Sequence, residues 1–209
     1  MKRILIIVSM IGLLAMSAAA QGANWKADAR KFQAELNRQY RDAKESPLDS
    51  LDRIHFKRHR FYRLRGKYCV VATCIPTPGM PEFEMPTVSG KTKTFVQVCL
   101  LTFAVGGHQD TLAAYRNLKI AEQAQYKDYL FIPFKDYSSG FKSYGGGRYI
   151  DWKMPADSLL EIKQVRLDFN QCYNPYCAYS TGWNCPIPPK ENYVQTYIHA
   201  GVRKWKHQH

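Results

Sequence analysis

Hydrophobic positions change their spacing near residue 46, from a helical period to an alternating one. Before this point the apolar residues recur every three or four positions: Trp25, Ala29, Phe32, Leu36, Tyr40 and Ala43. The spacing predicts an amphipathic helix over about residues 24–45. Asn24 is a suitable N-cap, and Ser46-Pro47 ends the helix because the residue before a proline avoids the α region. The polar face carries both signs of charge, so we expect the helix to pack on the protein body rather than on a membrane surface.

Beyond the helix, apolar and polar residues alternate, which predicts β-strands. The expected strands are 60–64, 67–75, 94–105, 111–115, 129–134, 148–152, 159–169 and 193–200. Gly106-Gly107 predicts a turn that joins the third and fourth of them in a hairpin. The proline-rich residues 76–89 are expected to form a flexible loop, and residues 121–127 a short helix or loop.

The strands follow one another without long helices between them, which favours an antiparallel sheet over βαβ units. The predicted fold class is therefore mainly β, an antiparallel β-sandwich or open barrel with one N-terminal amphipathic helix. No repeat or linker divides the sequence. Residues 21–209 are expected to form a single β-rich domain, with its β core at about residues 56–205.

The first 20 residues have the three-part layout of a secretory signal peptide. Lys2 and Arg3 precede an uncharged apolar run over residues 4–16, and Ala18-Ala19-Ala20 predicts cleavage before Gln21. A spanning helix needs about 20 apolar residues, so a retained membrane anchor is the less favoured alternative. No cysteine occurs before Cys69 to accept a lipid. We expect a soluble protein in the periplasm or outside the cell.

Net charge and cysteine content narrow the partners and the redox state. The chain has 209 residues and a formal net charge of +13, which falls to +11 without Lys2 and Arg3. Such a surface attracts polyanions, and for an exported protein these are acidic envelope glycans and lipid phosphates, with nucleic acid less favoured. The six cysteines favour disulfides over a metal site in an oxidising compartment, with 15 pairings if all are bridged.

The sharpest charge feature is a run of seven Lys and Arg residues within residues 53–67, interleaved with aromatic residues and histidines. Such a pattern is typical of phosphate-chain binding as well as of a merely solvated surface. The candidate polyanion-binding residues are Arg58, Arg60, Arg63 and Arg65. Arg58 and Arg60 stand at even positions, whereas Arg63 and Arg65 stand at odd positions. Because alternate residues of a strand point to opposite faces, one flat strand would place the two pairs on different faces.

Two stretches are more particular than a generic sheet: YLFIPFKDYSSGFKSYGGGRYIDW at 129–152 and LDFNQCYNPYCAYSTGWNCPIPPKENYVQTYIHAGVRKW at 167–205. Together they resemble the bacterial and archaeal family called domain of unknown function 1684. The family pattern begins with an LF-x-PF-x-D strand, here residues 130–136, and a GGR turn, here residues 145–149. A DFN-x-x-YNP-x-CAY segment follows at 168–179, then CP-x-PP-x-EN at 185–192 and an AG-x-K end at 200–204. The resemblance covers most of the mature chain and implies no activity.

The glycine-rich turn is the first candidate ligand site. Gly145, Gly146 and Gly147 allow positive φ and close approach, and consecutive amides beside Arg148 can form an anion-binding nest. The alternative is a tight turn or bulge in which Arg148 pairs internally with Asp136, Asp151 or Asp168. The spacing fits neither a dinucleotide fingerprint nor a P-loop.

The loop after the DFN strand is the second candidate site. Polar and aromatic side chains gather in it at Asp168, Asn170, Tyr173, Asn174 and Tyr179. Such a group can line a polar pocket, although Asp and Asn at a strand end also form Asx turns. No catalytic residue is assigned, and neither a cofactor nor a metal site is expected, since no triad order, HExxH or zinc spacing occurs.

Cys177 and Cys185 belong to the family pattern, whereas Cys69, Cys74, Cys99 and Cys172 do not. We expect a Cys177–Cys185 disulfide that closes a short loop, with free thiols, bound metal or a Cys172–Cys177 link as alternatives. The leading functional hypothesis is an exported module that binds an anionic envelope component or a small anionic ligand. The alternatives are a metal-independent hydrolase around Arg148 and Asp168, and a purely structural envelope protein.

Overall fold

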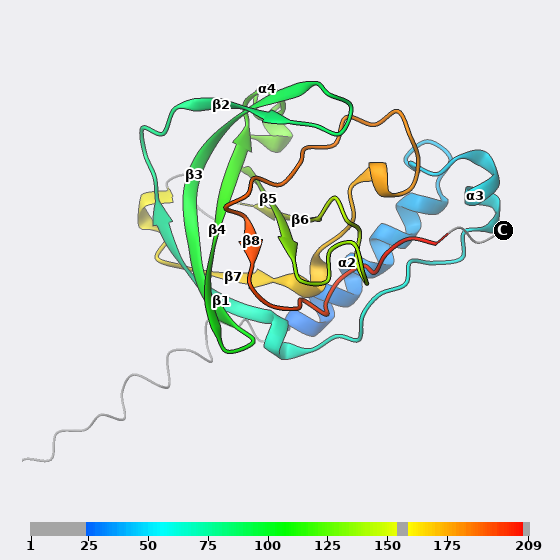
Figure 1. The fold of residues 1–209 in the computed structure, drawn as a ribbon, viewed down its shortest axis with the longest axis horizontal. Helices are drawn as coiled ribbons and strands as arrows, with labels where there is room; N and C mark the ends of the chain where they lie inside the picture. The colour runs from blue at the N-terminus through cyan, green and yellow to red at the C-terminus, as the bar shows by residue number, and fades with distance from the viewer. Residues whose placement is uncertain (1–23, 154–158, 207–209) are drawn as a thin grey trace, which may run out of the picture.

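The computed structural model describes residues 24–153 and 159–206 (Figure 1). The predicted signal peptide lies outside these residues. Strands dominate the fold: β1 (Cys69–Pro76), β2 (Glu82–Pro86), β3 (Thr92–Val105), β4 (His108–Asn117), β5 (Tyr129–Asp136), β6 (Arg148–Lys153), β7 (Gln164–Asp168) and β8 (Tyr193–Val194). The helices are α2 (Trp25–Arg41), α3 (Ser50–His55) and α4 (Leu118–Ala121). Short 3-10 turns are η1 (Gly66–Tyr68), η2 (Ala124–Tyr126), η3 (Leu159–Glu161), η4 (Phe169–Gln171) and η5 (Tyr176–Ala178).

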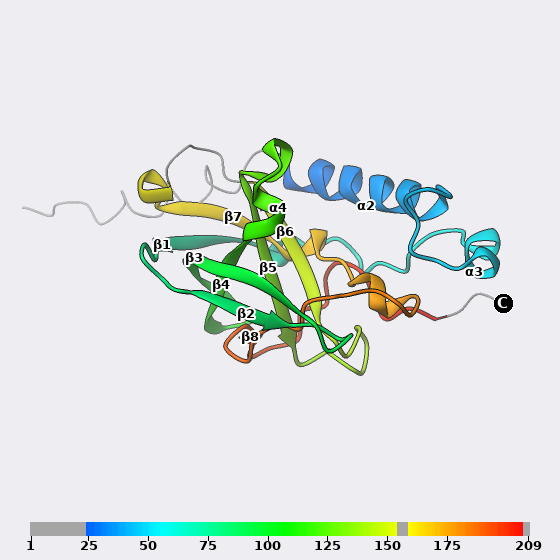
Figure 2. The same cartoon turned by 90° about the horizontal axis from the view of Figure 1, so that it is seen from above.

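The strands form one curled sheet in the order β6-β5-β4-β3-β1-β7, with β2 paired to β3 and β8 paired to β5 (Figures 1 and 2). All pairs are antiparallel except β5–β8, which is parallel. The mainly β prediction is confirmed, and the open barrel describes this single curled sheet better than a sandwich does. The predicted hairpin is also confirmed, since Val105 pairs with His108 across Gly106-Gly107.

Three apolar clusters hold the molecule together. The largest lies on one face of the sheet and includes Leu101, Ile132 and Phe134, which are completely buried. A second cluster lies on the other face, around Met85 and Phe95. The third joins α2 to the loops that follow the sheet, through side chains such as Tyr40. Burial on both faces explains why β3 and β5 are apolar almost throughout.

The N-terminal helix is shorter than predicted, and a second helix was missed. α2 ends at Arg41 because the carboxylate of Asp42 accepts the backbone N–H of Lys44 at 2.8 Å, which stabilises a turn before Ser46-Pro47. α3 begins where the Asp49 carboxylate accepts the N–H of Asp52 at 2.8 Å. This N-cap stabilises one and a half turns that the hydrophobic spacing does not indicate.

Two predicted strands are mostly absent, and the backbone bonds of the second run to another irregular segment rather than to a strand. The 193–200 strand is reduced to Tyr193–Val194, since carboxylates accept the N–H groups of Gln195 and Ile198. The 60–64 strand is only an isolated bridge at Phe61. Just before it, the buried residues Phe56 and His59 are three positions apart, so the chain approaches this bridge along an irregular path rather than as a flat strand.

Two further boundaries differ from the predictions. The expected loop over residues 76–89 contains β2, which pairs with the first residues of β3 because Met85 is apolar and fully buried. The expected 159–169 strand contributes only Gln164–Asp168, with 3-10 turns on either side.

Candidate functional site

Arg148, the first predicted ligand residue, is 0% exposed. Its guanidinium pairs with the Asp136 carboxylate at 3.2 Å and donates to the carbonyls of Ile198 and Ala200. The Asp136 carboxylate accepts in return the N–H of Ile198 at 2.7 Å. Arg148 therefore makes the internal pair that was the alternative to a ligand contact, and it fastens the C-terminal segment to β5 and β6.

The glycine-rich turn leaves no room for a ligand at its third position. Of the three glycines only Gly147 has a positive φ, of +91°, and a Cβ there would lie 2.6 Å from the Phe134 carbonyl oxygen. A Cβ on Gly146 would meet the ring of Tyr144. Gly146 and Gly147 are thus needed because neighbouring groups of the protein lie too close to allow a side chain there. Of the positive φ angles that the sequence allows at all three glycines, the structure has only the one at Gly147.

The polar residues of the DFN–YNP loop hold other chain segments in place. The amide of Asn170 pairs in both directions with the backbone of Arg65, with 3.1 Å for each bond. Asp168 accepts the Asn170 side chain at 2.7 Å and so orients it. Asn174 donates to the Arg203 carbonyl at 3.0 Å. Arg148 and Asp168 therefore do not meet Tyr173 in one open cleft.

Tyr179 is buried in the cluster beneath α2, and the half-buried Tyr173 packs against the same cluster. Its ring packs edge-on against Tyr40 at a centroid distance of 4.8 Å and against His59 at 5.6 Å. Burial raises the pKa of Tyr179 and lowers the pKa of His59 to about 3. His59 is thus neutral at physiological pH and adds no charge to the basic run around it.

The segment that carries the basic run is held in an extended, irregular path (Figure 1). The Asn37 carboxamide oxygen of α2 accepts the His59 N–H at 2.7 Å. The C-terminal segment runs beside it, with bonds from Tyr62 to Gly201 at 2.9 Å and from Arg203 to Arg60 at 2.8 Å. Three buried or half-buried amide side chains, those of Asn37, Asn170 and Asn174, therefore fasten these two segments to the protein.

Together the two segments expose a set of cations that we call the basic surface: Arg58, Arg60, Arg63, Arg65, Lys67, Arg203, Lys204 and Lys206. Arg203 is half-buried with its guanidinium 5.3 Å from the Tyr62 ring centroid, and the others are exposed. Neither 56–67 nor 195–206 contains Asp or Glu. Within the described residues, none of these eight side chains forms an ion pair. All four predicted polyanion-binding residues are thus exposed and lie on the first of these two segments.

A separate cavity of about 730 Å³, which we call the aromatic cleft, opens beside β5 and β6. Tyr129 and Phe131 of β5 and Tyr149 and Asp151 of β6 line it from alternate positions of adjacent strands. Side chains two apart share one face of a sheet, which brings these four together. The other face of the same strands belongs to the core.

β3, β4 and α4 also contribute lining side chains, and the remaining walls come from connecting segments. Among the aromatic residues of these segments, the lining includes Tyr126 of η2 together with Tyr173, Tyr176 and Trp183. Of the predicted ligand residues, only Tyr173 lies here. One feature of the sequence indicates this site. β5 has aromatic residues at both odd and even positions, so both faces of the strand are apolar, and the face away from the core must be covered by other segments or line a cleft.

Asp151 is the acidic group of the cleft. Its carboxylate accepts the Tyr173 hydroxyl at 2.8 Å. The side chain is open to the cleft but surrounded by protein elsewhere, and this desolvation raises the pKa of the carboxyl to about 6, against the lowering effect of the Tyr173 bond. Lys93 also lines the cleft, and partial burial lowers the pKa of its ammonium.

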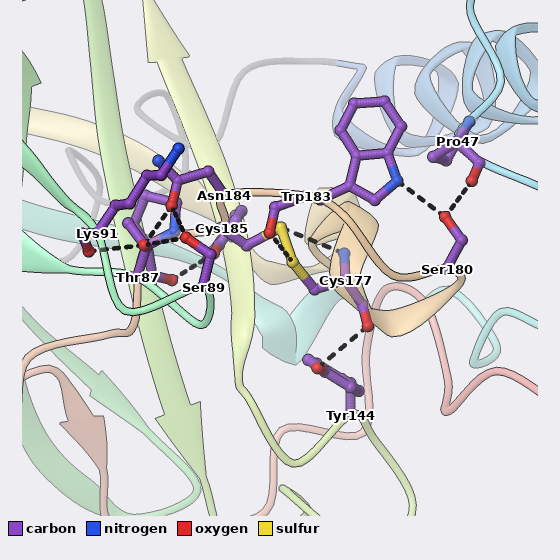
Figure 3. The surroundings of a disulfide bond; sticks show 12 residues. Pro47, Thr87, Ser89, Lys91, Tyr144, Cys177, Ser180, Trp183, Asn184 and Cys185 are labelled. Carbon is purple, nitrogen blue, oxygen red and sulfur yellow. Dashed lines mark hydrogen bonds between the residues drawn. A yellow bond between two sulfur atoms is a disulfide. The ribbon is translucent and has the colours of Figure 1, made fainter.

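A disulfide between Cys177 and Cys185 closes the loop that forms one wall (Figure 3). The Trp183 indole donates to the Ser180 hydroxyl at 2.8 Å, and that hydroxyl donates to the Pro47 carbonyl. Asn184 accepts from the hydroxyls of Thr87 and Ser89 on the β2–β3 turn. The loop is therefore tied on both sides, with Trp183 held at the mouth of the aromatic cleft.

Within residues 24–153 and 159–206, no group of three His, Cys, Asp or Glu side chains is arranged to hold a metal ion. None of the helices in that part of the chain is long and apolar enough to cross a membrane.

Comparison with known proteins gives a family and a fold but no activity. The chain is similar to an uncharacterized protein from gene locus rrnAC0354 of Haloarcula marismortui, solved by solution NMR, with 30% identity and a TM-score of 0.68. The match covers 86% of this chain and 94% of the other. No curated protein matches. Residues 54–203 match the sequence model of the family described as protein of unknown function, DUF1684, and the chain therefore belongs to that family.

Proposed function

We propose that this protein is an exported binding module for an anionic component of the cell envelope, either an acidic glycan or a lipid phosphate. The observation that carries the proposal is the basic surface, where eight cations from two acid-free segments are fastened side by side without ion-pair partners in the described chain. Like charges held at this density repel one another, and a bound polyanion relieves that repulsion.

The way the cations are held supports binding rather than chance exposure. Clamps from Asn37, Asn170 and Asn174 fix the backbone beneath Arg60, Arg65 and Arg203. The irregular path between Phe56 and Gly66 leaves Arg58, Arg60, Arg63 and Arg65 all exposed, despite their change of parity. A fixed backbone lowers the entropy lost when charged side chains engage a ligand.

Export is part of the proposal and rests on the sequence of residues 1–20 together with the disulfide. Disulfides persist in oxidising compartments, where the accessible polyanions are envelope glycans and lipid phosphates. The hydrolase alternative gains nothing from the geometry, because Arg148 and Asp168 are both buried with internal partners.

The test is retention on immobilised heparin and sedimentation with phosphatidylglycerol vesicles. We expect the triple variant Arg58→Gln, Arg60→Gln, Arg63→Gln to elute from heparin at clearly lower salt than the unchanged protein. The matched control is Lys26→Gln, Arg30→Gln, Lys31→Gln, which removes three exposed charges from α2. If heparin binds at the basic surface, the cations of that surface are the ones whose counterions are released on binding. The charges of α2 then contribute little, and the control should elute close to the unchanged protein.

The two probes distinguish the two sources of negative charge. Selective loss on heparin alone assigns an acidic glycan, and selective loss on vesicles alone assigns lipid phosphate. Equal shifts for the two triple variants would mean that only net charge matters and would refute the proposal. Absence of binding to both probes at low salt would refute it as well. Far-ultraviolet dichroism checks that both variants are folded.

A further inference from the structure

The aromatic cleft has exposed rings at its mouth and packed rings deeper inside. Tyr126, Tyr176 and Trp183 are 37%, 37% and 38% exposed. Below them the Phe131 and Tyr149 rings meet edge-to-face at 4.6 Å. Three large exposed aromatic side chains around one concave site are unusual unless they contact a ligand, because large apolar surface is normally covered.

These rings are fixed before any ligand arrives. Trp183 is held by its indole bond to Ser180 and packs edge-on against Tyr176 at a centroid distance of 4.8 Å. The disulfide closes the loop that carries Trp183 (Figure 3). Tyr149 donates its hydroxyl to the Pro186 carbonyl. Preorganised aromatic walls lose little entropy on binding, which suits a rigid ring-shaped ligand.

The polar groups of the cleft balance in charge. Asp151 supplies a carboxylate acceptor, Lys93 supplies a cationic donor, and Asn117, Gln123 and Asn184 supply amides. A strongly charged ligand would meet one repelling group whichever sign it carried. A neutral ligand with several hydroxyls can donate to Asp151 and accept from Lys93 and the amides.

We propose that the aromatic cleft binds a neutral saccharide, with the apolar C–H face of a pyranose ring on Trp183 and Tyr176 and its hydroxyls on Asp151 and the amides. Sugar rings carry both an apolar face and hydroxyl edges, and the cleft offers both kinds of partner. Its volume of about 730 Å³ is within the ordinary range for a small-ligand site of roughly 300–1,000 Å³. This inference is independent of the basic surface.

A quaternary ammonium ion is the main competitor, because aromatic rings with a nearby carboxylate also bind such cations. The lysine at position 93 and the net charge of +13 oppose a cationic ligand. A purely aromatic ligand would offer no hydrogen bond to the remaining lone pairs of Asp151 or to the N–H groups of the amides, which is unfavourable in a closed complex. The saccharide is the occupant that satisfies both sets of groups.

The test follows the four tryptophan indole N–H resonances by NMR during titration of the unchanged protein with cellotetraose and chitotetraose. We expect the Trp183 resonance, identified by its loss in Trp183→Phe, to shift with at least one of these probes. The other three indoles should move little. Tyr176→Ala and Trp183→Ala should each weaken binding about tenfold, as expected for removal of a stacking ring.

The matched control is Tyr137→Ala, which removes an exposed tyrosine that does not line the cleft. Its affinity should equal that of the unchanged protein. If Trp183→Ala unfolds the protein, Tyr126→Ala, which removes another exposed ring of the cleft, should also weaken binding. No shift with either saccharide at 10 mM, or a shift caused only by phenyltrimethylammonium, would overturn the proposal. Equal weakening in Tyr137→Ala would overturn the assignment to this cleft.

Discussion

At the scale of single residues, Arg148 shows how a buried cation fastens three chain segments. Its partners are the Asp136 carboxylate and two carbonyls of the C-terminal segment, and both charged side chains are 0% exposed. Replacing Arg148 by Ala removes the cation that pairs with the buried Asp136 carboxylate. We expect the free energy of unfolding, measured in urea, to fall by about 3–5 kcal/mol.

Arg166→Ala provides the matched control for this measurement. Arg166 pairs with Asp28 of α2, and both side chains are partly exposed. Loss of such a surface pair should cost less than about 1 kcal/mol. A comparable loss of stability in the two variants would contradict the structural role assigned to Arg148.

Asp151 provides a second residue-scale prediction. Desolvation raises the pKa of its carboxyl from 3.8 to about 6, and the Tyr173 hydroxyl bond works in the opposite direction. A carbon-detected NMR titration should therefore find one aspartate near 6. In Tyr173→Phe the stabilising bond to the ionised form is lost, and the pKa should rise further. A fall in the variant, or a normal value in the unchanged protein, would contradict this account.

The same shift has a defined effect on stability. Between about pH 4 and pH 6 the folded state holds the Asp151 proton more tightly than the unfolded state does. Relative to Asp151→Asn, the unchanged protein should therefore lose stability as the pH rises through this window. The difference between the two proteins should be constant above it.

Residue types in the sequence indicated polar contacts but not their partners. Asn170 and Asn174 were predicted as ligand groups, and both instead bind backbone carbonyls or N–H groups of segments far away in sequence. The sequence does not distinguish an asparagine whose amide is hydrogen-bonded to the backbone from one whose amide is free to bind a ligand. Only the three-dimensional path of residues 60–65 and 200–203 separates the two cases.

At the scale of elements, β3, β5 and β6 were predicted to within two residues at each end, whereas β2 was missed and β7 and β8 were predicted too long. β3 and β5 are apolar over most of their length, so alternation and turn residues locate them. Residues 195–200 have the same alternation, but Asp110 and Asp136 accept N–H groups there. Long-range acceptors of this kind leave no local pattern in the sequence, which is why β8 was predicted too long.

The disulfide loop is an element with its own prediction. Cys177 and Cys185 have Cα atoms 6.3 Å apart, within the range of ordinary disulfides. Peptide mapping without reduction should give one linked fragment containing both residues. Cys69, Cys74, Cys99 and Cys172 are buried and should react with alkylating reagents only after unfolding. A Cys172–Cys177 link would contradict the assignment.

Reduction of this bridge should have a local effect larger than its global one. Closing so short a loop contributes on the order of 2–3 kcal/mol in the chain-entropy account. Trp183, however, lies inside the loop and at the mouth of the aromatic cleft. We therefore expect its indole resonance to broaden or move on reduction, while the resonances of the core strands keep their positions.

At the scale of the whole molecule, the proposed basic surface and the proposed aromatic cleft differ in how the chain assembles them. The basic surface is visible in the sequence as a run of charges, although the contribution of residues 203–206 is not. The aromatic cleft is assembled from β3, β4, α4, β5, β6, η2 and segments within residues 173–186, and no helix or strand contributes more than three side chains. Contributions so dispersed form no motif, and only tertiary packing gathers them.

The last prediction concerns the form in which the molecule works. The apolar run over residues 4–16 is too short to span a bilayer, and small residues follow it at positions 18 and 20. We expect the exported protein to begin at Gln21, as measured by intact mass on the periplasmic fraction. Replacing Ala20 by Trp should block cleavage and retain the heavier, membrane-associated precursor. Unchanged protein that retains Met1 in that fraction would contradict the signal-peptide prediction. The proposal that the basic surface binds an envelope component would then lose its support.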